Sequence, residues 1–193
     1  MTGWTALVPM KAATNRKTRL ATHLCAAGRE ELSENLFYHV VHTLRDCCRI
    51  TRVVTLSDGL PPMSRMEWIA DQGAGLNAEL ERARAKIGAG PMLIIHADLP
   101  LLETADLDAL LAAAEGRIAI APDSHGTGTN ALALGTAHGL KLSFGAGSFA
   151  LHHAQVPDAA IITGRPGLAL DIDTVDDLDE AIRLGFFHRS AWS

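Results

Sequence analysis

Short apolar runs alternate with longer segments of helical character along most of this chain, and this alternation is the feature that most constrains its fold. The runs "LVP", "MLII" and "IAIA" have the composition of strands that are buried on both faces. Helix signals recur between the runs, such as Thr104 before "ADLDALLAAAEG" and the glycine that closes that segment. Strands that alternate with helices favour a mostly parallel sheet covered by helices on both faces. We therefore expect the α/β class, in a Rossmann-like three-layer αβα arrangement.

Individual segments carry more specific expectations. "KTRLATHLCAAG" predicts a helix that ends at Gly28, and "SENLFYHVVHTLRDC" predicts a second helix capped by Ser33. "GLALDID" predicts a strand close to the end of the chain. Thr174 is expected to cap the final helix, with Asp177 at the capping-box position.

Length and composition suit an ordinary globular protein. The 193 residues favour one domain, spanning residues 1–193, and 48% hydrophobic with 20% charged residues is typical of such domains. No apolar run reaches the ~20 residues of a membrane helix, and the first residues lack the order of a secretory signal. The three cysteines, Cys25, Cys47 and Cys48, lack zinc-finger spacing and suit buried thiols in a reducing compartment. We therefore expect a cytoplasmic protein.

The net charge of −5 is unevenly distributed. The first 29 residues hold no acid, whereas residues 171–180 hold six acids and no base. This pattern indicates an anion site near the start of the chain and a cation site near its end, although two solvated faces would look the same. The overall acidity argues against a nucleic-acid-binding protein, which would usually be basic.

Ligands of open α/β sheets bind at the carboxyl ends of the strands, so the residues that follow each strand are the candidates for chemistry. After the first predicted strand, Lys11, Arg16, Lys17 and Arg19 gather at a predicted helix start. The free N–H groups and partial positive charge of a helix start would add to these cations in a phosphate site. The segment has neither a Walker loop nor a Rossmann fingerprint, and a solvated basic turn is the alternative.

Aspartates follow two later strands. Asp98 comes after "MLII", and Asp171 and Asp173 flank one apolar residue, so that on a strand both would face the same side. Asp98 and Asp173, if folding brings them together, would form a hard-oxygen site for Mg²⁺. The alternative is a turn or cap role for Asp98. The adjacent His152 and His153 are assigned to packing.

Two glycine-rich loops carry hydroxyl groups. "GTGTN" lies between two predicted strands, and "FGAGSF" leads into a predicted helix. Glycines let backbone N–H groups approach a ligand, and hydroxyl groups donate to anionic oxygens, so we interpret the two loops as a cradle for a second anionic group. In "DQGAGLNAEL", the amides of Gln72 and Asn77 suit the edge of a base, and a glycine loop with an Asn cap is an equal interpretation.

In this order along the chain, "VPMKAATNRKTRLA", "ADLPLL", "PDSHGTGTNALAL", "FGAGSFALHHA" and "DIDTVDDL" resemble the CofC-type guanylyltransferases of deazaflavin coenzyme F-420 biosynthesis. The resemblance covers nearly the whole chain. It implies a nucleotide-diphospho-sugar-transferase-like fold and transfer of GMP from GTP to a three-carbon phosphorylated acid, with release of pyrophosphate. The acid would be phosphoenolpyruvate, 2-phospho-L-lactate or 3-phosphoglycerate, and the residues do not select among them.

The resemblance also implies roles for individual residues. The triphosphate would be held by Lys11 and Arg19, which with Asp98 would carry catalysis. The Mg²⁺ would be bound by Asp98 and Asp173, with Asp171 as a neighbour. The acid would be bound by Thr129, Gly145 and Ser148. The base would be read by the loop from Gln72 to Asn77.

The implied reaction needs no strong general base, because the attacking substrate phosphate is ionised near neutral pH. Catalysis would then rest on positioning and charge neutralisation. The alternatives are a molybdenum-cofactor-type nucleotidyltransferase and a non-catalytic nucleotide-binding module. The product would pass to a downstream transferase, and we expect neither a nucleic-acid nor a membrane partner. The apolar segment "NLFYHVV" leaves core packing and a homodimer contact both open.

Overall fold

Seven strands form one sheet in the computed structural model, which describes residues 3–10, 17–61, 63, 66–135 and 139–186. The order of the strands across the sheet is β3-β2-β1-β4-β6-β5-β7. Their bounds are Trp4–Pro9 for β1, Ile50–Ser57 for β2, Glu67–Ala70 for β3, Met92–Ile95 for β4, Ile118–Pro122 for β5, Thr129–Leu134 for β6 and Ala160–Ile161 for β7. Strand β6 runs antiparallel to both β4 and β5, and the other neighbouring pairs are parallel. The predicted α/β class with a mostly parallel sheet is therefore confirmed.

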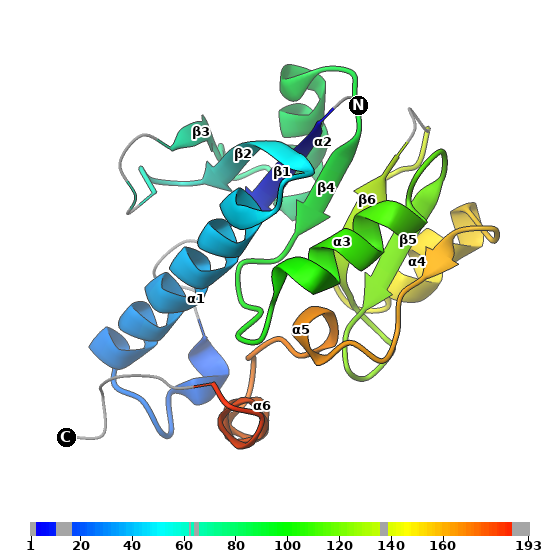
Figure 1. Ribbon diagram of the computed structural model, residues 1–193. Coiled ribbons are helices and arrows are strands. Elements are labelled where there is room, and N and C mark those ends of the chain that lie inside the picture. Colours follow the sequence, from blue (N-terminus) through cyan, green and yellow to red (C-terminus); the bar gives the residue numbers. More distant parts are fainter. Residues whose placement is uncertain (1–2, 11–16, 62, 64–65, 136–138, 187–193) are drawn as a thin grey trace.

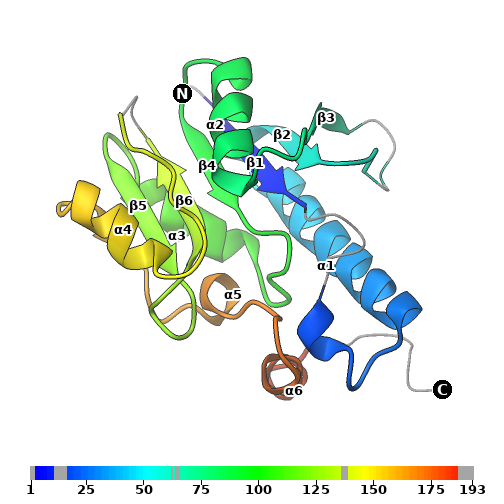
Figure 2. The same cartoon turned by 180° about the vertical axis from the view of Figure 1, so that it is seen from behind.

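Helices cover both faces of the sheet (Figures 1 and 2). One face is covered by α1 (Ala26–Asp46), α3 (Thr104–Ala113) and the short α5 (Pro166–Ala169), and the other by α2 (Leu76–Ile87) and α4 (Ser148–Gln155). A third apolar cluster joins the short 3₁₀ helix η2 (Thr18–Leu20), α1 and α6 (Val175–Arg183) at one edge of the sheet. This cluster packs Leu20 and Leu24 against α6, which lies near the end of the described chain.

Helix α1 corrects two of our predictions. It runs without interruption through Gly28, which was predicted to end a helix, and through Ser33, which was predicted to start one. Gly28 lies in the first turn, where its N–H group donates to Sγ of the N-cap residue Cys25. The Ser33 hydroxyl donates to the Arg29 carbonyl one turn earlier, so it is bonded within the helix instead of capping it.

The predicted strand at residues 167–173 is also wrong. Pro166 begins α5 instead, as proline favours at the first position of a helix. The buried Asn130 amide on β6 donates to the carbonyls of Leu168 and Ala169, so a side chain and not a strand neighbour bonds this segment. The predicted Thr174 cap with its Asp177 capping box is confirmed at the start of α6.

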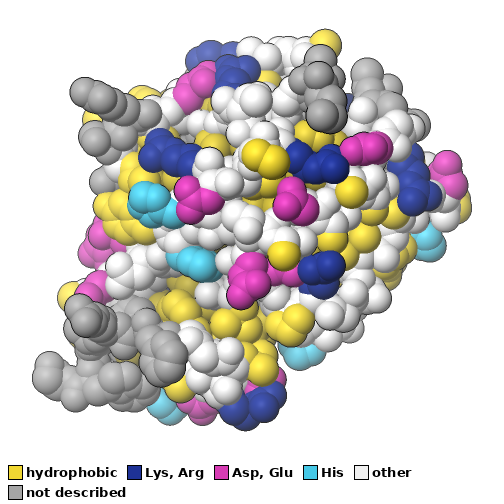
Figure 3. Space-filling view, viewed as in Figure 1, with side chains coloured by type: hydrophobic (Ala, Val, Ile, Leu, Met, Phe, Trp, Pro, Cys, Tyr) yellow, Lys and Arg dark blue, Asp and Glu magenta, His cyan; other side chains and the backbone are white. Residues whose placement is uncertain are grey.

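The surface seen in Figure 3 mixes basic and acidic side chains, without a continuous basic stripe among the residues drawn in colour. Within the described part of the chain, no helix is both long and apolar enough to cross a membrane.

Candidate functional site

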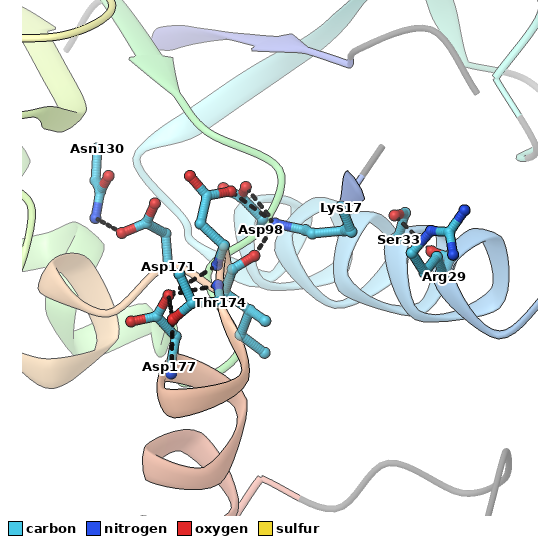
Figure 4. Close-up of polar contacts among 10 residues, drawn as sticks. Lys17, Arg29, Ser33, Asp98, Asn130, Asp171, Thr174 and Asp177 are labelled. Atoms are coloured by element: carbon cyan, nitrogen blue, oxygen red, sulfur yellow. Dashed lines mark hydrogen bonds and ion pairs between the residues drawn. The ribbon is translucent and has the colours of Figure 1, made fainter. Parts of the chain in front are cut away.

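Three carboxylates meet at the carboxyl edge of the sheet (Figure 4). Asp98 follows β4, whereas Asp171 and Asp173 lie between α5 and α6. One oxygen atom from each carboxylate lies within 4.8 Å of the other two. The backbone ties these segments together, because the Ile172 N–H donates to the Asp98 carbonyl at 3.2 Å. The meeting of Asp98 and Asp173 that the sequence required of a cation site therefore occurs, although the second segment is not a strand.

Asp171 is a partly buried carboxylate of the cluster, and its surroundings favour its protonated form. Burial raises the pKa of Asp171 to about 6, and repulsion from Asp98 and Asp173 acts in the same direction. The Asn130 side chain partly offsets these effects by donating to Asp171 Oδ1 at 3.3 Å. The cluster therefore favours an additional positive charge beside it.

Lys17 supplies such a charge in the described structure. Its ammonium donates to Asp98 Oδ2 at 2.7 Å and to the Ile172 carbonyl, and it lies 3.6 Å from Asp173 Oδ1. The side chain is only 6% exposed. Burial lowers the Lys17 pKa, but the attraction of Asp98 and the other carboxylates outweighs it, so that the pKa is raised overall. The ammonium is therefore charged at neutral pH.

The backbone around Asp173 is held by the start of α6. The Asp177 carboxylate accepts the N–H groups of Asp173 at 3.1 Å and of Thr174 at 2.7 Å. It also accepts the Thr174 hydroxyl, which in turn caps the helix. This capping box fixes the segment that presents Asp173 to the cluster.

The predicted phosphate-binding residues have different outcomes. Lys11 and Arg16 lie outside the described residues. Arg19 is exposed in η2. Lys17 was counted among the basic residues without a role of its own, and in the described part of this segment it contacts the carboxylates. Its sequence signal was its place directly before the turn "TRL" in an acid-free stretch.

The "GTGT" loop folds around a carboxylate of the chain itself. Asp123 accepts the N–H groups of Thr127 and Gly128, both at 2.8 Å, and the Thr127 hydroxyl at 3.2 Å. A Cβ on Gly128 would lie 2.6 Å from Asp123 Oδ2, which explains the glycine there. The interpretation of these groups as a ligand cradle is corrected: in this structure they bind Asp123.

The two glycine-rich loops nevertheless lie side by side, since the Phe149 N–H donates to the Thr127 carbonyl at 3.2 Å. Gly145 and Gly147 adopt φ angles of +120° and +72°, which side chains disfavour, and Ser148 begins α4. Thr129 is buried, and its hydroxyl is hydrogen-bonded to Nδ1 of His152 at 3.1 Å. Binding of the acid at Thr129, Gly145 and Ser148 stays a prediction.

Asn77 holds the backbone of Phe144 in this structure. Its amide donates to the Phe144 carbonyl at 3.0 Å and accepts the Phe144 N–H at 2.7 Å. Both ends of the amide therefore hold the Phe144 backbone, and reading of the base by Asn77 stays a prediction. Gln72 is exposed in the loop before α2, where its role in reading the base stays a prediction.

Comparisons with known proteins agree with this architecture. The chain matches the family described as "Guanylyl transferase CofC like" over residues 4–190. It is 38% identical to a phosphoenolpyruvate guanylyltransferase of Sphaerobacter thermophilus, over 91% of this chain and 90% of that one. It is 36% identical to a protein of the same name from Conexibacter woesei, over 90% and 85% of the two chains.

Solved structures show the same fold at low sequence identity. A protein of Desulfovibrio desulfuricans, provisionally assigned as a nucleotide-diphospho-sugar transferase, superposes with a TM-score of 0.73 at 17% identity, covering 95% of this chain and 88% of that one. A nucleotidyl transferase from Methanothermobacter gives 0.64 at 14% identity, covering 95% and 99%. A family match over nearly the whole chain, with relatives of similar length, establishes that this protein belongs to the CofC-like guanylyl transferase family.

Proposed function

We propose that the protein joins the guanylyl group of GTP to phosphoenolpyruvate and releases pyrophosphate, with Mg²⁺ held by Asp98, Asp171 and Asp173. The observation that carries the proposal is the cluster of three carboxylates at the edge of the sheet, in a chain of this family. The choice of phosphoenolpyruvate is supported by the names of the Sphaerobacter and Conexibacter relatives.

The residues of the cluster suit a hard divalent cation. Carboxylate oxygens are the protein ligands that Mg²⁺ prefers, and it commonly takes the rest of its shell from water and substrate phosphates. The Lys17 ammonium beside Asp98 marks the position as one where positive charge is stabilised. When bound, the ion would offset the negative charge of the two phosphorylated substrates.

The bond changes need little from the protein beyond alignment and charge. A phosphate oxygen of phosphoenolpyruvate attacks the α-phosphorus of GTP, and the bond from that phosphorus to the bridging oxygen breaks. Pyrophosphate leaves with the electron pair. Because the attacking phosphate is already ionised, no side chain has to remove a proton. The chain's cations, Lys17 and the predicted Lys11 and Arg19, would weaken the repulsion between the two anions.

The acid would lie near the start of α4. Gly145 precedes this eight-residue helix and Ser148 begins it, and the partial positive charge of a helix start favours an anion. A cation held by the carboxylate cluster would in turn bind the substrate phosphates.

Pyrophosphate release from purified protein tests the proposal. The protein is incubated with Mg²⁺, GTP and one of the three acids, and pyrophosphate and the guanylylated acid are measured together. We expect the two products in equal amounts with phosphoenolpyruvate. Asp98→Asn should lower the rate by about 10²–10³, the usual effect of losing one charge-stabilising contact. The control is Asp158→Asn, an exposed carboxylate outside the cluster, which should retain the parent rate.

Two outcomes would contradict this assignment. Turnover by Asp98→Asn at the parent rate would remove the carboxylate cluster from the mechanism. No pyrophosphate with any of the acids would leave a nucleotide-binding module or, if a pterin were accepted instead, a molybdenum-cofactor enzyme. The expectation of buried thiols is correct for Cys47 and wrong for Cys25 and Cys48, which are exposed. All three are free, so we place the activity in the cytoplasm. We also propose that a downstream transferase consumes the product.

A further inference from the structure

We propose that Lys17 is a built-in counter-ion that holds the carboxylate cluster together before the metal arrives, and that metal binding displaces its ammonium. This inference rests on the proposed metal site. It says that the Lys17 ammonium and the metal ion occupy the same position in turn. Its basis is the position of Nζ in the cluster and the way the chain holds Lys17 there.

The ammonium lies where a hard cation would bind. Among the described residues, Nζ contacts three oxygen atoms: Oδ2 of Asp98 at 2.7 Å, Oδ1 of Asp173 at 3.6 Å and the Ile172 carbonyl oxygen. Two of these oxygens belong to carboxylates of the cluster whose ligand atoms converge within 4.8 Å (Figure 4). A divalent ion and an ammonium held by the same carboxylates would repel each other strongly at this separation. The two cations therefore compete.

The chain holds the Lys17 backbone beside the cluster at a conformational cost. Lys17 has a φ angle of +51°, the only positive φ of a non-glycine residue among those the structure describes. Its carbonyl accepts the Leu20 N–H and so begins η2. Leu20 is fully buried in the same apolar cluster as Ile172, whose carbonyl accepts the ammonium. The turn that follows Lys17 is thus held in place, and displacement is a motion of the long, rotatable side chain.

Displacement of the Lys17 ammonium by the metal would also make the charge of Lys17 available to the substrates. In the metal-free protein the ammonium is neutralised by Asp98 and Asp173 and is almost fully buried. Once the ion binds to those carboxylates, the ammonium is no longer neutralised by them and is free to pair with a substrate phosphate. The positive charge of Lys17 then reaches the substrates only after the metal has bound.

Metal binding without any substrate tests the exchange. Free Mn²⁺ is counted by electron paramagnetic resonance during titration of the parent protein, Lys17→Met and Lys17→Arg. Lys17→Met keeps the length and loses the charge, so we expect it to bind Mn²⁺ at least tenfold more tightly than the parent. Lys17→Arg keeps a competing cation and should bind less tightly than Lys17→Met. Equal affinities of the parent and Lys17→Met would overturn the proposal.

Amine labelling of the parent protein separates displacement from simple repulsion, and it needs no variant. Reductive methylation is followed at each lysine by mass spectrometry, with and without saturating Mg²⁺. Lys17, 6% exposed without metal, should label several-fold faster with Mg²⁺, while the exposed Lys86 keeps its rate. An unchanged Lys17 rate in protein that binds Mn²⁺ would refute displacement and leave the metal site standing. Absence of Mn²⁺ binding in every protein would refute both.

Discussion

The pH dependence of stability should reveal one buried neutral histidine, His152. Its side chain is fully buried, and its Nε2 accepts the Ser143 N–H at 3.0 Å, which requires that nitrogen to be unprotonated. Burial lowers the pKa of His152 from 6.5 to about 4. The sign follows from linkage: below pH 6.5 the unfolded chain gains a proton on this residue that the folded chain does not gain until about pH 4. The contribution of His152 to the free energy of unfolding is therefore fully present above pH 6.5, and it is lost as the pH falls from 6.5 to about 4.

The magnitude is large enough to measure. The full interval corresponds to ~3 kcal/mol, since one pKa unit is about 1.4 kcal/mol. Between pH 7 and pH 5, His152 should account for a loss of ~2 kcal/mol in the free energy of unfolding. Urea unfolding at the two pH values measures it in the parent protein and in His152→Gln, which cannot ionise. The variant should start less stable at pH 7 and lose ~2 kcal/mol less than the parent on going to pH 5.

A destabilised protein that keeps the histidine is the matched control. Asn77→Ala weakens the same region, since its amide holds Phe144 beside Ser143, and it leaves His152 in place. It should show the full loss of the parent between pH 7 and pH 5. If His152→Gln loses as much stability as the parent over this range, His152 is not the group that folding keeps neutral, and the reasoning from burial is refuted.

Other substitutions test separate contacts. Gly135→Ala should lower the free energy of unfolding by ~3 kcal/mol or more, because its Cβ would lie 1.7 Å from the Ala114 carbonyl oxygen. Gly59→Ala, with nothing within 4 Å, should change it by under ~0.5 kcal/mol, and urea unfolding compares the two. Asn77→Ala should cost ~2 kcal/mol for two lost hydrogen bonds; a KM for GTP within about twofold of the parent would leave Asn77 a structural role alone, whereas a tenfold rise would support its predicted base-reading role. Asn130→Ala should cost ~2–3 kcal/mol by thermal or urea unfolding, and no change would contradict its part in holding the residue 168–171 segment.

The sequence was most informative about the fold where apolar pattern and topology act together. Runs such as "MLII" predict buried strands because both faces of an inner strand need apolar side chains, and parallel strands end at the same edge. This reasoning predicted that Asp98 and Asp173 could meet. The segment carrying Asp173 proved irregular, because the Asn130 side chain bonds carbonyls that a strand neighbour would otherwise reach.

Other features of the site depend on contacts between distant residues. Glycine N–H and hydroxyl groups indicate that an anionic group binds to the "GTGT" loop. The pattern is the same whether that anionic group belongs to a ligand or to Asp123 of the chain itself. The amide of Asn77 suits a base edge and a peptide group equally well, because both offer one donor and one acceptor. The role of Lys17 depends on a fold that brings residues 17, 98 and 173 together, which no local pattern records.

Transfer of isotope from the acid substrate tests the central claim most directly. Phosphoenolpyruvate labelled with ¹⁸O in its phosphate is incubated with GTP, Mg²⁺ and the protein, and the products are analysed by mass spectrometry. Attack of that phosphate on the α-phosphorus predicts that all the label appears in a guanylylated phosphoenolpyruvate and none in the pyrophosphate. Unlabelled GMP or labelled pyrophosphate as the main product would contradict guanylyl transfer at this cluster.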